Sequence, residues 1–176
     1  TVDFSSTNAS LTAGPVANFP GGQQNLLDGA PVVGDLSVLP SLKLPTAAAA
    51  SGLGTGTTDA GLVLISSREI GPISLDLNVG YTRRSGPGTI APRSASLWTA
   101  SFGGPAIGGL GWTAEVYGYP GTSGPAGQAP IVAFLGGPTL LAHSWLALDA
   151  GVIVPITGPQ PRALYAGGVI NIGRVW

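Results

Sequence analysis

Residues 73–84, with the sequence ISLDLNVGYTRR, alternate regularly between apolar and polar positions. Every second residue from Ile73 to Tyr81 is apolar, and the positions between them, continuing to Arg84, are polar or glycine. Since successive side chains of a strand point to opposite faces, this pattern predicts a strand with one apolar and one polar face. The stretch is also long enough for a tilted strand to cross a bilayer, which takes roughly 9 to 11 residues.

Seven further segments are predicted to be strands, most of them with the same alternation: 35–45, 59–69, 94–102, 109–119, 129–137, 144–154 and 162–176. The predicted fold class is all-β, an antiparallel up-and-down transmembrane β-barrel of about eight clear strands. Residues 32–176 form this barrel. Residues 1–31 are rich in turn-forming Gly, Pro, Asn and Asp, and we expect an irregular segment there, in which VDFSSTNASLTAG could add one weak strand.

The connections between these segments alternate in length. Those at 46–57, 85–93 and 119–128 are long, and those at 69–72, 103–109 and 138–142 are short. Outer-membrane barrels have short periplasmic turns and longer extracellular loops. The alternation therefore favours a barrel in a bacterial outer membrane, with 156–161 as a further outer loop and lipid as its surroundings.

Composition supports a surface that need not face water. Only 9% of the residues are charged and 44% are hydrophobic, whereas a soluble domain has about 25% charged residues. No apolar run approaches the roughly 18 residues of a transmembrane helix. If the surface meets lipid, the backbone must be satisfied between strands, which a closed barrel achieves.

Several functional classes are disfavoured. The net charge of −1 and the lack of a basic stripe argue against nucleic acid. The absence of Cys excludes disulfides and thiolate metal sites, and we expect no metal and no cofactor. The glycines of GLGTG at 52–56 do not form a dinucleotide fingerprint, because no helix is predicted after them.

The polar positions of the predicted strands are the candidate functional residues. A charge on the lipid face near the midplane costs a few kcal/mol, so these side chains should point inward. They would line a polar lumen that conducts or binds a solute, or instead form a structural network that fills a narrow barrel. The lumen-lining candidates are Asp76, Asn78, Arg84, Glu115, Asp149 and Asn171.

Aromatic residues lie near strand ends and within strands, as expected for the girdles at the two membrane interfaces. The alternative is an aromatic ligand site, and Trp145 in particular falls on the same predicted face as Asp149. A terminal aromatic residue is also typical of the last strand of such barrels. The interface candidates are Tyr81, Trp98, Trp112, Tyr119 and Trp176.

No catalytic residues are predicted. His143 is the only histidine, and its neighbour Ser144 would point to the opposite face of a strand. A Ser–His hydrolase needs the two side chains to converge, together with an orienting acid. A hydrolase is therefore a minor alternative, and we expect that the protein is not an enzyme.

Several short motifs resemble those of a known family. They are SLKLPT, GLGTGTTDAGLVLISSREIGPISLDLNVGY, WTAEVYG and LALDAGVIVPITGPQPRALYAGGVINIG, spread over residues 35–176. This set is similar to the outer-membrane transporter family named after the MetA pathway of phenol degradation. The resemblance implies an outer-membrane barrel for uptake of hydrophobic or aromatic compounds, and it implies no catalytic residues.

The sequence thus leads to two functional expectations. The first is a passive outer-membrane channel or transporter for small hydrophobic or aromatic compounds. The second is a structural or interaction subunit of a larger assembly or homo-oligomer, as a membrane barrel or a soluble β-sandwich, because large apolar faces indicate either lipid or protein partners.

Overall fold

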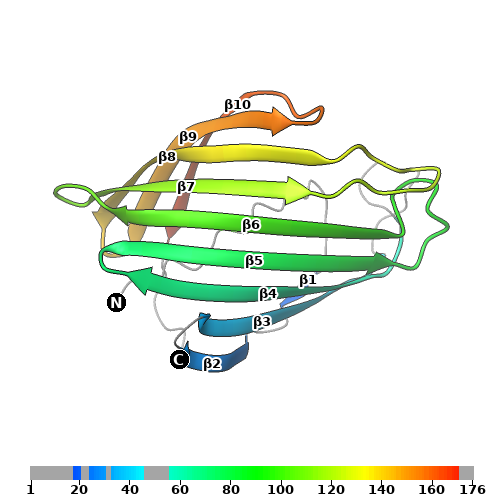
Figure 1. The fold of residues 1–176 in the computed structure, drawn as a ribbon, viewed down its shortest axis with the longest axis horizontal. Helices are drawn as coiled ribbons and strands as arrows, with labels where there is room; N and C mark the ends of the chain where they lie inside the picture. The colour runs from blue at the N-terminus through cyan, green and yellow to red at the C-terminus, as the bar shows by residue number, and fades with distance from the viewer. Residues whose placement is uncertain (1–17, 21–23, 31–32, 46–55, 171–176) are drawn as a thin grey trace.

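The structure is a computed structural model of the 176-residue chain, and it describes residues 18–20, 24–30, 33–45 and 56–170. Every regular element in these ranges is a β-strand, and the strands form one antiparallel sheet (Figure 1). The strands are β1 (Asn18–Pro20), β2 (Gln24–Ala30), β3 (Gly34–Lys43), β4 (Asp59–Ile70), β5 (Ile73–Arg84), β6 (Ser94–Pro105), β7 (Leu110–Tyr119), β8 (Ile131–His143), β9 (Leu146–Thr157) and β10 (Ala163–Ile170).

The order of the strands follows the chain. From β3 to β10 each strand pairs with its sequence neighbour, always antiparallel. β1 and β2 lie one after the other along the remaining side of β3. This up-and-down, all-β arrangement confirms the fold class that the alternation predicts.

The sheet curls, so that β9 and β10 turn behind the plane of the central strands in Figure 1. Among the strands that the structure describes, none pairs with the outer edge of β10 or with the outer edges of β1 and β2. The described sheet is therefore open, and its closure into a barrel stays a prediction.

Two strands lie within residues 1–31, where the sequence leads us to expect an irregular segment. β1 and β2 both pair with β3, and the register shifts between Asn25 and Leu27 and again between Leu27 and Ala30. Gly29, with φ +62°, lies in the second irregularity, and its amide donates to Asp35 Oδ1 at 2.6 Å. Turn-forming residues are accommodated here as bulges in an edge strand. The candidate weak strand VDFSSTNASLTAG lies outside the described residues.

β8 is longer than predicted, because PTLLA at 138–142 continues the strand and is not a connection. The expected interruption is local: β8 and β9 pair at Gly136 and again at Thr139, whereas Gly137 and Pro138 between them pair with β7 but not with β9. Proline cannot donate to the ladder, so a strand that continues past it loses pairing there. The actual turn is formed by Ser144 and Trp145.

The predicted alternation of connection lengths is present. The turns β4–β5, β6–β7 and β8–β9 lie at one end of the sheet and the loops β5–β6, β7–β8 and β9–β10 at the other (Figure 1). We call these the short-turn end and the long-loop end. The turn at 71–72 uses Gly71 at φ +62°, a conformation that glycine adopts without the steric cost of a Cβ atom.

The sheet has almost no hydrophobic core. In the part of the chain whose burial is described, the buried hydrophobic residues are Ile65 and Ala133. On β5, Val79 is 60% exposed although its neighbour Asn78 is only 7% exposed. The apolar face is therefore open and the polar face sheltered, the reverse of a water-soluble fold.

Close packing on the apolar face is visible where Trp98 of β6 lies over Gly118 of β7. A Cβ atom added to Gly118 would lie 2.5 Å from Cε2 of the Trp98 indole. An aromatic ring that covers a glycine on the neighbouring strand helps to fix the register of the two strands. The same addition at Gly80 of β5 would meet Val63 Cγ2 at 3.4 Å, an ordinary contact.

We expect Gly118→Ala to lower the free energy of unfolding by about 1–3 kcal/mol, because the added methyl group displaces the indole. Gly80→Ala, the matched control in another buried strand position, should change it by less than about 1 kcal/mol. Denaturant unfolding in detergent, followed by tryptophan fluorescence, measures both. Equal effects at the two positions would show that Trp98 does not depend on Gly118.

Candidate functional site

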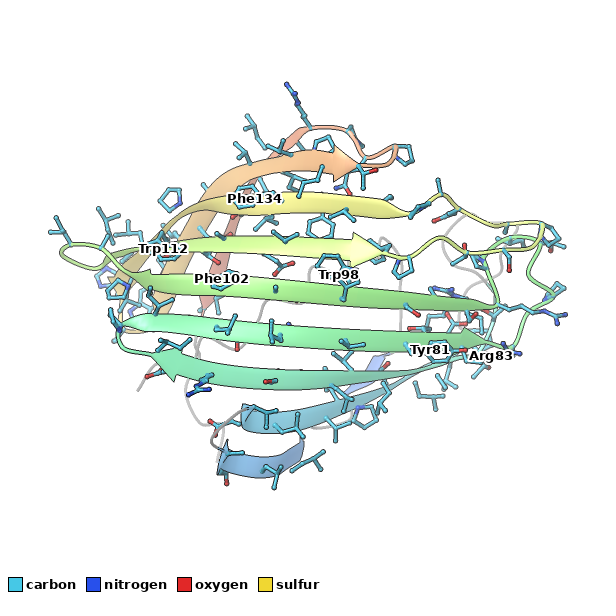
Figure 2. All side chains as sticks on the ribbon, in the orientation of Figure 1. Tyr81, Arg83, Trp98, Phe102, Trp112 and Phe134 are labelled. Atoms are coloured by element: carbon cyan, nitrogen blue, oxygen red, sulfur yellow. The ribbon has the colours of Figure 1, made fainter. Side chains whose placement is uncertain are left out.

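The register divides the side chains between two faces of the sheet. One face is apolar across neighbouring strands: Val79 pairs with Trp98, and Leu75 pairs with Phe102. Figure 2 shows that the labelled aromatic side chains of β6, β7 and β8 lie on the outer side of the curl. The opposite, concave face holds the alternate positions of these strands, among them Asp76, Thr99 and Glu115.

Three of the predicted interface aromatics lie on the apolar face. Tyr81 is near the long-loop end and Trp112 near the short-turn end, as expected for two girdles (Figure 2). Trp98 lies within β6, where its ring covers Gly118 of β7, and its place at an interface stays a prediction. Trp176 lies outside the described residues.

Tyr119 differs from the other interface candidates, because the register places it on the concave face. Its ring meets that of Tyr117 edge-on, with centroids 6.0 Å apart. The hydroxyl oxygen of Tyr117 accepts from the amide of Gln160 at 2.5 Å. These groups form an aromatic part of the concave face near the β9–β10 loop.

Trp145, which the alternation places on the same face as Asp149, lies instead in the β8–β9 turn and is 49% exposed. Its ring stacks on that of His143 with centroids 5.4 Å apart. No group of three or more His, Cys, Asp or Glu side chains suited to a metal ion occurs in the described ranges. His143 is thus a stacking partner at the short-turn end.

The predicted lumen candidates Asp76, Asn78, Arg84, Glu115 and Asp149 all lie on the concave face, and Asn171 lies outside the described residues. Ser67 donates to Asp76 Oδ1 at 2.5 Å, and Ser101 donates to Glu115 Oε2 at 2.6 Å. These four side chains belong to one row across the strands, because the register pairs Ser67 with Asp76, Asp76 with Ser101 and Ser101 with Glu115.

Other candidates are not in this row. The amide nitrogen of Asn78 donates to Thr99 Oγ1 at 2.8 Å, one row nearer the long-loop end. Its carbonyl oxygen is buried without a partner in the described structure. Asp149 lies toward the short-turn end of β9 and beside Gly167 of β10, where an added Cβ atom would lie 2.9 Å from its Oδ1 atom. No direct contact joins Asp149 to Glu115 among the described interactions.

A charged cluster at the long-loop end of the concave face includes a residue that the sequence analysis missed. Asp59 is 8% exposed, and its Oδ2 atom lies 2.5 Å from Lys43 Nζ and 3.6 Å from Arg84 Nε. Thr57 donates to the other carboxylate oxygen at 2.6 Å. Asp59 and Ala60 are successive residues of β4, so alternation places Asp59 on the polar face and Ala60 on the apolar face. This alternation was the signal in the sequence that could have identified Asp59 as a site residue.

Between this charged cluster and the Asn78–Thr99 pair, one row of the concave face is apolar. The register aligns Leu39, Val63, Gly80 and Leu97 on four adjacent strands. The concave face is thus graded from a charged rim, through an apolar row, to the carboxylates of Asp76 and Glu115. Such a surface can contact a small molecule that has both an apolar body and a polar group.

Together these features define an antiparallel up-and-down sheet with an exposed apolar face and a sheltered polar face. No family model, curated protein or solved structure matches this chain. The resemblance to the phenol-degradation transporter family therefore stays a prediction. No helix in the described part of the chain is long and apolar enough to cross a membrane.

We expect Asp59→Asn to lower the free energy of unfolding by about 2 kcal/mol, since it removes the negative charge that faces Lys43 and Arg84. A fully buried pair would cost 3–5 kcal/mol, but the two cations are 21% and 22% exposed, which screens them. Glu69→Gln is the control, at the exposed opposite end of the same strand face. The shift of the denaturation midpoint measures both, and a similar small shift for each would show that the cluster is not stabilising.

Proposed function

We propose that this chain is a bacterial outer-membrane β-barrel that acts as a passive channel or transporter for small hydrophobic or aromatic compounds. The observation that supports the proposal most directly is the exposed apolar face combined with a nearly absent core. Leu62, Leu64, Val79 and Tyr81 are each more than 40% exposed and adjacent on β4 and β5. In water, an uncovered face of this extent marks a membrane or protein contact.

Strand lengths agree with a membrane span. β4, β5, β6 and β9 have 12 residues each, and a tilted transmembrane strand needs about 9–11. The alternation of short turns and long loops is also that of outer-membrane barrels, whose long loops are extracellular. In this orientation the short-turn end faces the periplasm.

The concave face supports the proposed class of solute. Its apolar row of Leu39, Val63 and Leu97 offers contacts to an aromatic or aliphatic body, and the Asp76–Glu115 row beyond it offers polar contacts. The sequence resemblance to the phenol-degradation transporters implies the same class of compound.

The proposal requires that the free edges of β10 and of β1 and β2 be paired in the membrane, because lipid cannot satisfy backbone N–H and C=O groups. The open edges also favour a second candidate function. In that case the chain is a structural or interaction subunit, and partner chains in a homo-oligomer or larger assembly cover its edges and its apolar face.

The membrane proposal predicts heat-modifiable electrophoretic mobility after extraction of membranes with detergent. A folded membrane barrel keeps its structure in the cold detergent and migrates at a different apparent size after boiling. The comparison of boiled and unboiled samples is the measurement. Recovery as a monodisperse particle without detergent, with no mobility shift, would instead favour the structural subunit.

The transport proposal predicts that reconstituted protein opens an ion conductance that benzyl alcohol blocks. Leu97→Asn should weaken this block about fivefold, because the polar group removes roughly 1 kcal/mol of apolar contact in the apolar row. Leu97→Val, which stays apolar, should keep it within about twofold. Absence of both conductance and solute flux would count against transport. Equal effects of Leu97→Asn and Leu97→Val on the block would count against binding in the apolar row.

A further inference from the structure

A hollow lies at the long-loop end of the sheet, apart from the concave face. It has a volume of about 500 Å³ and is formed by the end of β5, the start of β6 and the loops β5–β6 and β7–β8. Its polar lining includes Arg83, Arg93, Ser94, Ser96, Thr122 and Ser123. The strand residues among them are not on the concave face, since the register places Arg83, Ser94 and Ser96 on the same face as Tyr81.

Backbone hydrogen bonds hold the two loops together around this hollow. The amide of Ala126 donates to the carbonyl of Gly88 at 3.2 Å, which joins loop β7–β8 to loop β5–β6. The amide of Arg84 donates to the carbonyl of Arg93 at 2.8 Å and fixes the end of the β5–β6 loop. Within loop β7–β8, Thr122 and Gln128 are linked by two further hydrogen bonds, of 3.0 and 2.9 Å.

Gly88 is required for the position of the Arg93 side chain. It has φ +83°, and a Cβ atom added to it would lie 3.1 Å from Arg93 Cγ. The stem of Arg93 therefore packs on the Gly88 backbone. Arg93 is held against the loop, although it remains exposed to a ligand.

The charge of the hollow is positive and uncompensated. Neither loop, 85–93 or 120–130, contains an Asp or Glu residue. Within the described ranges, the ion pairs at this end of the sheet join Asp59 to Lys43 and Arg84, and these three residues lie on the concave face. Arg83 and Arg93 have no carboxylate partner there.

We infer that this hollow binds a phosphate group. Two guanidinium groups supply fork-shaped donors that match phosphate oxygens, and the Ser94, Ser96, Thr122 and Ser123 hydroxyls add further donors. The volume exceeds that of a bare phosphate and can take a larger headgroup that contains one. Arg83 also lies one strand repeat beyond Tyr81 on the apolar face (Figure 2), where the headgroups of a surrounding bilayer would lie.

The phosphate group could come from a lipid headgroup or from a free phosphate in solution. The lipid source rests on the proposed membrane function, but the binding of phosphate itself does not. Equilibrium binding to the full chain in neutral detergent therefore uses three probes: phosphatidic acid in mixed micelles, phosphatidylcholine in the same micelles, and inorganic phosphate alone.

We expect Arg83→Gln and Arg93→Gln each to weaken phosphatidic acid binding about tenfold, as expected when one charge-assisted donor pair is removed. Arg83→Lys should recover only part of the loss, because it restores the charge without the fork. The matched control is Arg162→Gln. Arg162 is an exposed arginine of loop β9–β10 at the same end of the sheet but outside the hollow, and its loss should change affinity by no more than about twofold.

Selective binding of phosphatidic acid over phosphatidylcholine assigns the lipid source, and equally tight binding of inorganic phosphate assigns a soluble one. The inference is overturned if none of the probes binds, or if Arg162→Gln is as damaging as the two pocket variants, because the effect is then only general attraction. Electrophoresis of boiled and unboiled portions of the same samples tests the membrane proposal separately. A normal mobility shift without phosphate binding would reject this inference alone.

Discussion

The structure depends on its ladder of interstrand hydrogen bonds more than on a packed core. From β3 to β10 the register is nearly continuous, yet Ile65 and Ala133 are the buried hydrophobic residues among those whose burial is described. A single layer of this kind cannot be stabilised in water by hydrophobic burial, since each sheet must cover its apolar face with another layer. The stabilising layer must therefore come from outside the described sheet.

This requirement links the two faces. If lipid covers the apolar face, the backbone must be fully paired and the polar side chains must turn away from the lipid. The concave face meets the second condition, because it holds Asp76, Asn78 and Glu115, which bond to hydroxyl groups there: Ser67 and Ser101 donate to the two carboxylates, and Asn78 donates to Thr99. A hydroxyl donor offsets part of the cost of holding a carboxylate in a sheltered place. The polar side chains of the concave face can therefore lie close together in a sheltered space.

Period-2 alternation was enough to predict most of the sheet and which side chains share a face. It placed Asp76, Asn78 and Glu115 together correctly, because a residue's face depends only on local parity once the strand is right. It failed at β8, where Pro138 suggested an end but costs only a local gap in the ladder. It also failed at β1 and β2, where pairing with β3 overrides the turn-forming sequence.

The tertiary sites were beyond the reach of periodicity. Asp59 and Lys43 lie on either side of a long loop, and only the β3–β4 register brings them together. The hollow with Arg83 and Arg93 is formed by two loops without any repeating pattern, whose approach is set by the Ala126–Gly88 hydrogen bond. Local sequence does not encode such contacts, so alternation alone could not identify either cluster.

The distribution of charge between rim and interior bears on the proposed solute. The long-loop end holds Lys43, Arg83, Arg84, Arg93 and Arg162, five of the seven cations of the chain. Deeper on the concave face lie the carboxylates of Asp76, Glu115 and Asp149. If the concave face lines the proposed path, an uncharged compound gains contact with the apolar row and carries no charge that either region would repel. This supports hydrophobic or aromatic molecules as the proposed solutes.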